Sequence, residues 1–188
     1  MSKWKINDVI LMGLLAFLFG GVFMGAGYLY VVLYAALTPS GNAAFANEIL
    51  FGLWVMAGPM IAMLIPKKGS ATVGEILAAL AEMLMGSHFG VGVLLSGLIQ
   101  GFGTELGFIV TRYRRYDILS LSLGAVGTTL LSYFYEYFKL GYHAYPLERN
   151  LIMLGVRFVS VYIFGVILVI LVMRLVKTAQ ETVRNQHV

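Results

Sequence analysis

The chain has 188 residues, of which 60% are hydrophobic and only 12% are charged. Soluble domains carry about 25% charged residues, so this composition excludes an ordinary soluble globular protein. The formal net charge is +4, and the absence of cysteine excludes disulfides, thiol catalysis and cysteine-ligated metal. A spanning helix needs about 20 apolar residues, so we expect residues 1–188 to form a single all-α integral membrane domain with six transmembrane helices and short loops.

Apolar stretches separated by turn residues predict these six helices in chain order. They cover residues 7–37, 45–65, 70–85, 91–110, 118–138 and 151–175. Two glycines in residues 25–27 predict a bend in the first helix, and Pro66 ends the second. Residues 38–44 and 139–150 contain the proline, glycine and asparagine that are typical of loops.

The basic residues lie mostly on one side of the predicted spans. With the N-terminus in the cytoplasm, ten of the 13 lysines and arginines are cytoplasmic: Lys3, Lys5, Lys67, Lys68, Arg112, Arg114, Arg115, Arg174, Lys177 and Arg184. Lys139 and Arg149 fall outside, and Arg157 lies within a span. Because cytoplasmic loops carry the excess of lysine and arginine, both termini are predicted to be cytoplasmic.

Four glutamates lie inside apolar stretches, namely Glu75, Glu82, Glu105 and Glu136, whereas Arg157 is the only basic residue placed comparably. An acidic side chain at the centre of a bilayer costs about 2.5–3.5 kcal/mol on insertion scales. This excess of negative charge must be offset by hydrogen bonds, by protonation or by a cation. We expect Arg157 to pair with one glutamate, and the remainder to favour a bound organic cation.

Acidic and aromatic residues gather in the outer half of the predicted spans. They are Glu48, Trp54, Glu82, Tyr133, Tyr135, Glu136 and Tyr137, with His88, Tyr142, His143 and Tyr145 in the outer loops. Aromatic faces attract a cation by about 0.5–2 kcal/mol each, so the cluster predicts a site for a flat cation. Two alternatives stay open, because the tyrosines equally fit an interfacial aromatic belt and Glu48 alone fits the N-terminus of a helix.

Glu75 and Glu82 are separated by almost two helical turns, so they project from one stripe about 10 Å apart along the axis. One small ligand group cannot contact both equally. Glu82, at the outer depth, is assigned to the substrate. Glu75 is expected to make a structural contact with a backbone group or with another helix.

In the fourth predicted helix, Gly97, Gly101 and Glu105 repeat every four residues on one face. Small residues at this spacing let helices approach closely, which predicts that Glu105 is buried against a neighbour. Gln100 lies at mid-membrane depth with four hydrogen-bonding sites to satisfy. It fits two roles equally: reading a heterocycle's amine and ring nitrogen, or bonding to another helix.

The first predicted helix carries Gly13, Ala16 and Gly20 on one stripe. Small residues spaced by four allow either close packing within the protein or docking of a second membrane protein. The pattern does not decide between the two.

No motif in the chain indicates an enzyme. Gly-x-Ser-x-Gly, His-Glu-x-x-His and Walker A sequences are absent, and the three histidines do not form a metal-ligand pattern. The basic residues follow membrane topology rather than a nucleic-acid pattern. We therefore expect no catalytic residue, no metal and no cofactor of its own.

Several segments resemble a known family. They are Glu48-x-x-x-Gly52-x-Trp54, the stretch from Gly74 to Glu82 followed by Gly86, Gln100-Gly101-x-Gly103-x-Glu105, Tyr135-Glu136, Gly141-Tyr142-x-Ala144-Tyr145, and Arg157. In their order and spacing they are similar to the YkoE-like S components of energy-coupling factor (ECF) transporters, which are associated with thiamine and its hydroxymethylpyrimidine precursor. The similarity runs from about Lys3 to the last predicted helix.

The resemblance implies a function and partners that the residues alone do not indicate. The protein would capture thiamine or hydroxymethylpyrimidine from outside a prokaryotic cell. The substrate-binding residues themselves are expected from residue type and depth, and they are Glu48, Trp54, Glu82, Gln100, Tyr133, Glu136 and Tyr142. It would work with a transmembrane coupling protein, met by the Gly13, Ala16 and Gly20 stripe, and with two cytoplasmic ABC ATPases that consume the ATP. It would topple in the membrane when this complex engages it, and residues 38–47 or 139–146 would act as a lid.

Two other hypotheses remain from the residues. One is a cation channel or proton-coupled carrier that uses the glutamates as a relay without ATPase partners; clustering of the glutamates in the outer half argues against it. The other is an accessory subunit whose glutamates are all paired internally.

Overall fold

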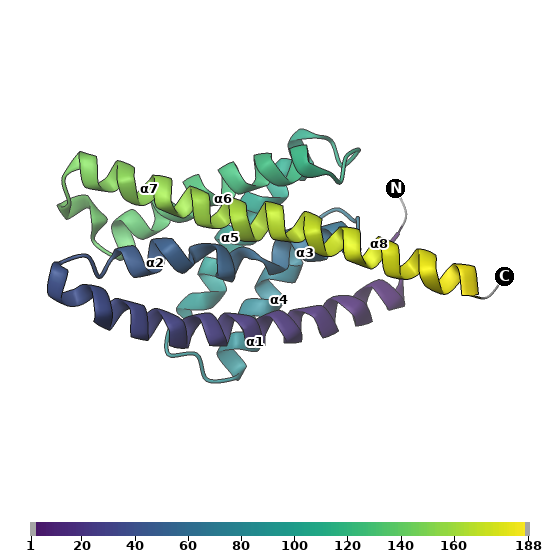
Figure 1. The fold of residues 1–188 in the computed structure, drawn as a ribbon, viewed down its shortest axis with the longest axis horizontal. Coiled ribbons are helices and arrows are strands. Elements are labelled where there is room, and N and C mark those ends of the chain that lie inside the picture. The colour runs from purple at the N-terminus through teal and green to yellow at the C-terminus, as the bar shows by residue number, and fades with distance from the viewer. Residues whose placement is uncertain (1–2, 187–188) are drawn as a thin grey trace.

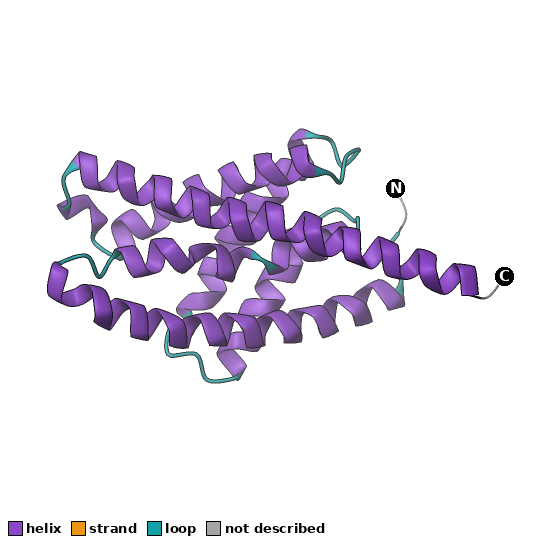
Figure 2. Cartoon of the chain, viewed as in Figure 1, coloured by secondary structure: helices purple, strands orange, loops and turns teal. Residues whose placement is uncertain are grey.

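The computed structural model describes residues 3–186, with side chains up to Thr182, so Arg184 of the orientation prediction lies outside the described side chains. Every regular element in this range is a helix (Figure 2). The longer helices are α1 Ile6–Leu37, α2 Phe45–Leu50, α3 Ala57–Leu64, α4 Ser70–Leu84, α5 Gly92–Val110, α6 Ile118–Lys139, α7 Leu147–Tyr162 and α8 Leu168–Gln186. Four short turns complete them: η1 Thr38–Ser40, η2 Phe51–Val55, η3 Tyr142–Ala144 and η4 Ile163–Ile167.

The helices form an elongated bundle whose two ends differ (Figure 1). Both termini lie at one end, together with the connections 65–69 and 111–117, whereas loops 38–44 and 139–146 lie at the other. The basic loops and the termini therefore share one end.

In the described part of the chain, five stretches are long and apolar enough to span a bilayer: Ile6–Ser40, Phe45–Leu64, Gly92–Val110, Ile118–Lys139 and Leu147–Thr182. The third predicted span, which is α4, is not among them and has 15 residues. At 1.5 Å per residue it is roughly 22 Å long, shorter than the roughly 30 Å hydrocarbon core.

Helix α4 is held by close packing against its neighbours, and this packing uses part of the small-residue stripe of α1. A Cβ on Gly20 would lie 2.5 Å from Cβ of Ala81 in α4, and Ala16 is buried. Internal packing therefore accounts for both residues, so the expected docking stripe does not lie free as a whole. Of the three stripe residues, Gly13 alone has open space around it.

Two long spans are interrupted where they face each other, at η2 and at the π turn η4. A Cβ on Gly52 would lie 2.2 Å from the carbonyl oxygen of Ser160, so only glycine permits this approach. The Ser160 hydroxyl accepts a hydrogen bond from the Gly52 N–H at 2.9 Å and donates to the Ile49 carbonyl at 2.7 Å. The backbone groups released by the irregular turn are thus satisfied inside the membrane-spanning part, as lipid surroundings require.

The last span begins four residues earlier than expected, at Leu147. Pro146 precedes it, and proline is well suited to the start of a helix because its missing N–H is not needed there. The Asn150 amide donates to the Tyr142 and Tyr145 carbonyls at 3.0 and 3.1 Å, which ties the loop to this helix. The glycines in residues 25–27 do not interrupt α1, which is continuous through them.

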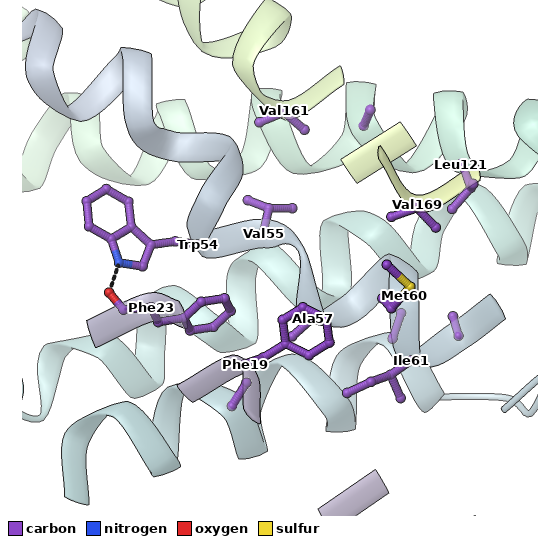
Figure 3. Packing of buried hydrophobic residues seen from close by; sticks show 14 of the residues in the cluster. Phe19, Phe23, Trp54, Val55, Ala57, Met60, Ile61, Leu121, Val161 and Val169 are labelled. Atoms are coloured by element: carbon purple, nitrogen blue, oxygen red, sulfur yellow. Dashed lines mark hydrogen bonds between the residues drawn. The ribbon is translucent and has the colours of Figure 1, made fainter. Parts of the chain in front are cut away.

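The hydrophobic core lies between α1, the η2–α3 segment and α7–α8 (Figure 3). Phe23 of α1 lies beside Trp54, and the Trp54 Nε1–H donates to the Phe23 carbonyl at 3.1 Å. This bond satisfies the polar group of a largely buried indole and fixes its ring plane.

Candidate functional site

A cavity of about 180 Å³ lies between α1, η2, α4, α5 and α6. Its lining residues are Phe23, Tyr30, Asn47, Phe51, Trp54, Glu82, Phe89, Val93, Ser96, Gln100, Glu136, Lys139 and Leu140. Lys139 and Leu140 lie where α6 ends, so the cavity reaches the end of the bundle opposite the two termini (Figure 1).

One wall of the cavity is aromatic. Trp54 lies edge-on to Phe89, with ring centroids 5.8 Å apart and an interplanar angle of 87°. Tyr30 of α1 lies 5.5 Å from the Phe89 ring and 6.1 Å from the Trp54 ring. In the short 3-10 turn η2, residues three apart eclipse, which places Phe51 and Trp54 on the same side of the segment.

Glu82 supplies a carboxylate to this aromatic wall. Its side chain is 2% exposed and accepts a hydrogen bond from the Ser87 hydroxyl at 2.8 Å. Among the described residues it forms no ion pair. A buried carboxylate with a single hydroxyl donor is poorly compensated, and a cation entering the cavity would compensate it.

Behind the cavity wall, Arg157 is fully buried and bridges two carboxylates. Its Nε and Nη2 donate to Glu48 at 2.6 and 2.8 Å, and Nη2 also bonds to Glu136. The guanidinium carbon lies 3.9 Å from the centroid of the Phe51 ring, and Asn47 donates to Glu136 at 2.7 Å. With both carboxyls ionised, the group carries one net negative charge beside the cavity.

Three comparisons with known proteins bear on this arrangement. A family model described as an ABC-type cobalt transport system, permease component, matches residues 7–131. The putative HMP/thiamine permease protein YkoE of Bacillus subtilis (strain 168) is 34% identical over 160 residues, which is 85% of this chain and 78% of that protein. A crystal structure of an S component of an ECF transporter matches with a TM-score of 0.87 and 31% identity, over 95% of this chain and 88% of that one. This chain belongs to the YkoE-like S components of ECF transporters.

Membership in this family confirms transport as the general role and a multi-pass location in the prokaryotic plasma membrane. The relative and the structural neighbour are transporter components rather than enzymes. The family model's description names cobalt; among residues 3–186, the structure contains no group of three His, Asp or Glu side chains suited to a metal ion.

The residues predicted to bind substrate in this S component divide into two sets. Trp54, Glu82, Gln100 and Glu136 line the cavity. Glu48, Tyr133 and Tyr142 lie behind its wall.

The second set supports the first. Tyr142 donates to Glu48 at 2.8 Å, and Tyr133 donates to the Asn150 side chain at 2.8 Å. Burial, together with the nearby Glu48 and Glu136 carboxylates, raises the pKa of the Tyr142 hydroxyl and keeps it a donor. Glu48 is bonded to Arg157 and does not face the cavity. Tyr142 and Tyr133 bond to Glu48 and Asn150, and so they hold the residues behind the cavity wall in place.

Sequence reasoning missed several lining residues of this S component, notably Tyr30, Asn47, Phe89, Ser96 and Lys139. Phe89 comes from the short α4–α5 loop, where residue type pointed only to the neighbouring His88. Of the two expected lids, residues 38–47 contribute Asn47 and residues 139–146 contribute Lys139 and Leu140. The available clues to the role of Asn47 were its place in the first expected lid and its adjacency to Glu48.

Glu75 and Glu105 lie outside the cavity, and each is bonded to backbone. Glu75 accepts a hydrogen bond from the Gly58 N–H of α3. Glu105 accepts from the Gly69 N–H at 2.7 Å and the Thr72 N–H at 3.1 Å, at the N-terminus of α4. The amides left free in a helix's first turn favour such a carboxylate.

Proposed function

We propose that this S component captures thiamine or its hydroxymethylpyrimidine precursor in the cavity lined by Glu82 and Trp54. The observation that carries the proposal is a buried, unpaired carboxylate facing an aromatic wall in a protein 34% identical to a putative HMP/thiamine permease. A thiazolium ring is a permanent cation and would be held by charge and by stacking. Cations over aromatic faces gain most when both partners are desolvated, and the Trp54 ring that would meet the cation is largely buried.

The polar lining of the cavity matches the other ring of the ligand. Gln100, Ser96 and Asn47 offer amide and hydroxyl groups that can pair with an aminopyrimidine's amine and ring nitrogens. Glu136, already bonded to Arg157, adds a carboxylate acceptor at the same wall. Glu48, Tyr133 and Tyr142 contribute by holding Arg157 and the wall in place.

The size of the cavity bears on which ligand fits without rearrangement. About 180 Å³ is below the roughly 300–1,000 Å³ of pockets for drug-sized ligands. A single pyrimidine ring fits this space more readily than the two rings of thiamine. Thiamine would require Phe89 and Lys139 to move outward.

The proposed orientation places both termini and the basic loops in the cytoplasm, with the cavity facing outside. A transmembrane coupling protein and two ABC ATPases would then complete the importer and use the ATP. The face of α1 left free for the coupling protein contains Gly13, Gly21 and Gly25, each with open space around it.

Calorimetry on the purified protein tests the proposal with thiamine and hydroxymethylpyrimidine as ligands. We expect saturable binding of one or both below millimolar concentration. Glu82→Gln should weaken thiamine at least tenfold and the neutral pyrimidine less, because only thiamine loses a counter-charge. Glu181→Gln, the same change on an exposed residue of α8, is the control and should bind like wild type.

Absence of binding of both ligands would refute the substrate assignment. Equal losses for the two ligands would remove the role of Glu82 as counter-charge while leaving the cavity as the site.

A further inference from the structure

The turn after α5 has an unusual backbone. Seven described residues have φ in the left-handed region, and five of them are glycines: Gly41, Gly69, Gly86, Gly90 and Gly141. The other two are consecutive, Arg112 at φ 55° and Tyr113 at φ 56°. Residues with a side chain rarely adopt this conformation, so each needs a reason to be there.

The turn has the hydrogen bonds of a Schellman motif. The Arg112 N–H donates to the Ile109 carbonyl at 2.8 Å, and the Tyr113 N–H donates to the Phe108 carbonyl at 2.7 Å. In this motif the first residue beyond the helix cap is left-handed and is usually glycine. Here that position is Arg112, where glycine would relieve the strain.

Contacts within the protein account for the left-handed backbone at Tyr113 but not for that at Arg112. The Tyr113 ring packs against the core that includes Phe108, and the Lys68 ammonium lies 5.7 Å from its centroid. Arg112 is exposed, and in the described part of the chain its side chain has no hydrogen bond or ion pair. A strained arginine without an internal partner indicates an external one.

The depth of the turn identifies the kind of partner. Val110 is 66% exposed just before the turn, and Ile118 is 56% exposed just after it. Such apolar side chains lie in the hydrocarbon of the bilayer, so the turn between them lies at the level of the lipid headgroups. Arg114 is also exposed and forms no ion pair with any residue that the structure describes, and Lys68 adds a third cation, whereas Arg115 is paired with Asp117 at 2.6 Å.

We propose that Arg112, Arg114 and Lys68 form a binding site for the phosphate of an anionic phospholipid in the leaflet at the end of the bundle that carries both termini. Arginine pairs with phosphate oxygens through parallel N–H donors, which a turn projecting into the headgroup layer can present. The lipid would hold the α5–α6 connection beside the N-terminus of α4. This site is independent of the cavity and does not rest on its ligand.

Thermal unfolding of the full-length protein tests the site, in zwitterionic detergent and in nanodiscs of phosphatidylcholine with and without phosphatidylglycerol. Arg112→Gly should raise the melting temperature in detergent but reduce the stabilisation by phosphatidylglycerol in nanodiscs. In detergent the melting temperature should rise by about 2–4 °C, because the left-handed strain is relieved. In nanodiscs, the increase in melting temperature that phosphatidylglycerol produces should be at most half of the increase measured for wild type.

Two further variants keep the test decisive. Arg112→Asn also tolerates the left-handed region and should behave like Arg112→Gly. Lys177→Gln removes an exposed charge of α8 near the same end and should keep the full gain from phosphatidylglycerol.

The proposal is overturned if Arg112→Gly and Arg112→Asn keep the full gain, or if Lys177→Gln loses as much as they do. It is also overturned if both Arg112 variants melt below wild type in detergent, since Arg112 would then have an internal role. Soluble glycerol phosphate producing the same gain would indicate a small-anion site instead of a lipid site.

Discussion

The two ends of the bundle use buried glutamates differently. Toward the end with the termini, Glu75 and Glu105 are bonded to backbone N–H groups of neighbouring segments. Toward the other end, Glu82 has only the Ser87 hydroxyl and faces a cavity. The comparison teaches that an acid within a membrane span is not by itself a sign of a ligand. Glu75 also has a single donor, and its Oε1 has no partner among the described residues, so what distinguishes Glu82 is its place beside open space.

Among the changes that test this comparison, removal of Arg157 should cause the largest loss of folding free energy. Arg157→Gln leaves Glu48 and Glu136 as two buried carboxylates without a cation, which typically costs about 3–5 kcal/mol of folding free energy. We expect little folded protein, measured as the monodisperse fraction in size-exclusion chromatography. Adding Glu48→Gln should recover part of it, whereas normal folding of the single variant would contradict the pairing.

The contact between the interrupted spans should be nearly as sensitive. Gly52→Ala places a Cβ against the Ser160 carbonyl and should cost about 1–3 kcal/mol by forcing the backbones apart. Its melting temperature should fall well below that of wild type. Gly155→Ala, in the same helix as Ser160 but with open space around the glycine, is the matched control and should melt unchanged or slightly higher.

Loss of the Glu105 carboxylate, which accepts hydrogen bonds at the N-terminus of α4, should lower stability without changing ligand binding. Glu105→Ala leaves the Gly69 and Thr72 amides without their acceptor and should cost about 1–2 kcal/mol. Thermal unfolding and ligand titration on the same sample test it. A loss of affinity without a loss of stability would place Glu105 in the binding function and blur the contrast between the two ends.

The smallest expected effect concerns Lys139, a cation that lines the cavity without pairing with either of its carboxylates. Lys139→Gln should tighten thiamine by two- to fivefold, about 0.5–1 kcal/mol, because a repelling charge is removed at a solvent-screened position. A neutral pyrimidine should bind as before in the same calorimetric titration. Weaker thiamine binding would instead assign Lys139 a positioning role.

The sequence predicts the helices well where turn residues bound long apolar stretches, as at the ends Leu37 and Val110 and at the start Ile118. It does not predict η2 or η4, because the Gly52–Ser160 contact that accompanies them joins residues 108 positions apart. Periodicity carries no information about such a partner.

The site could be predicted only in part for a similar reason. Trp54, Glu82, Gln100 and Glu136 follow from residue type and depth in a span. Depth in the span does not show that Arg157 pairs with Glu48 and Glu136, because the sequence places Glu82 in the same outer half. Only the side-chain geometry shows which of the three carboxylates Arg157 reaches.

The π turn η4 has a consequence for how this helix tolerates changes in length. A π turn holds one residue more than the α-helical turn it replaces. Deleting one residue among Ile163–Ile167 can therefore restore a regular helix, whereas a deletion elsewhere rotates everything beyond it by about 100°. A variant of this chain that lacks one residue at this point would therefore keep Arg157 facing Glu48, and α8 would keep its direction.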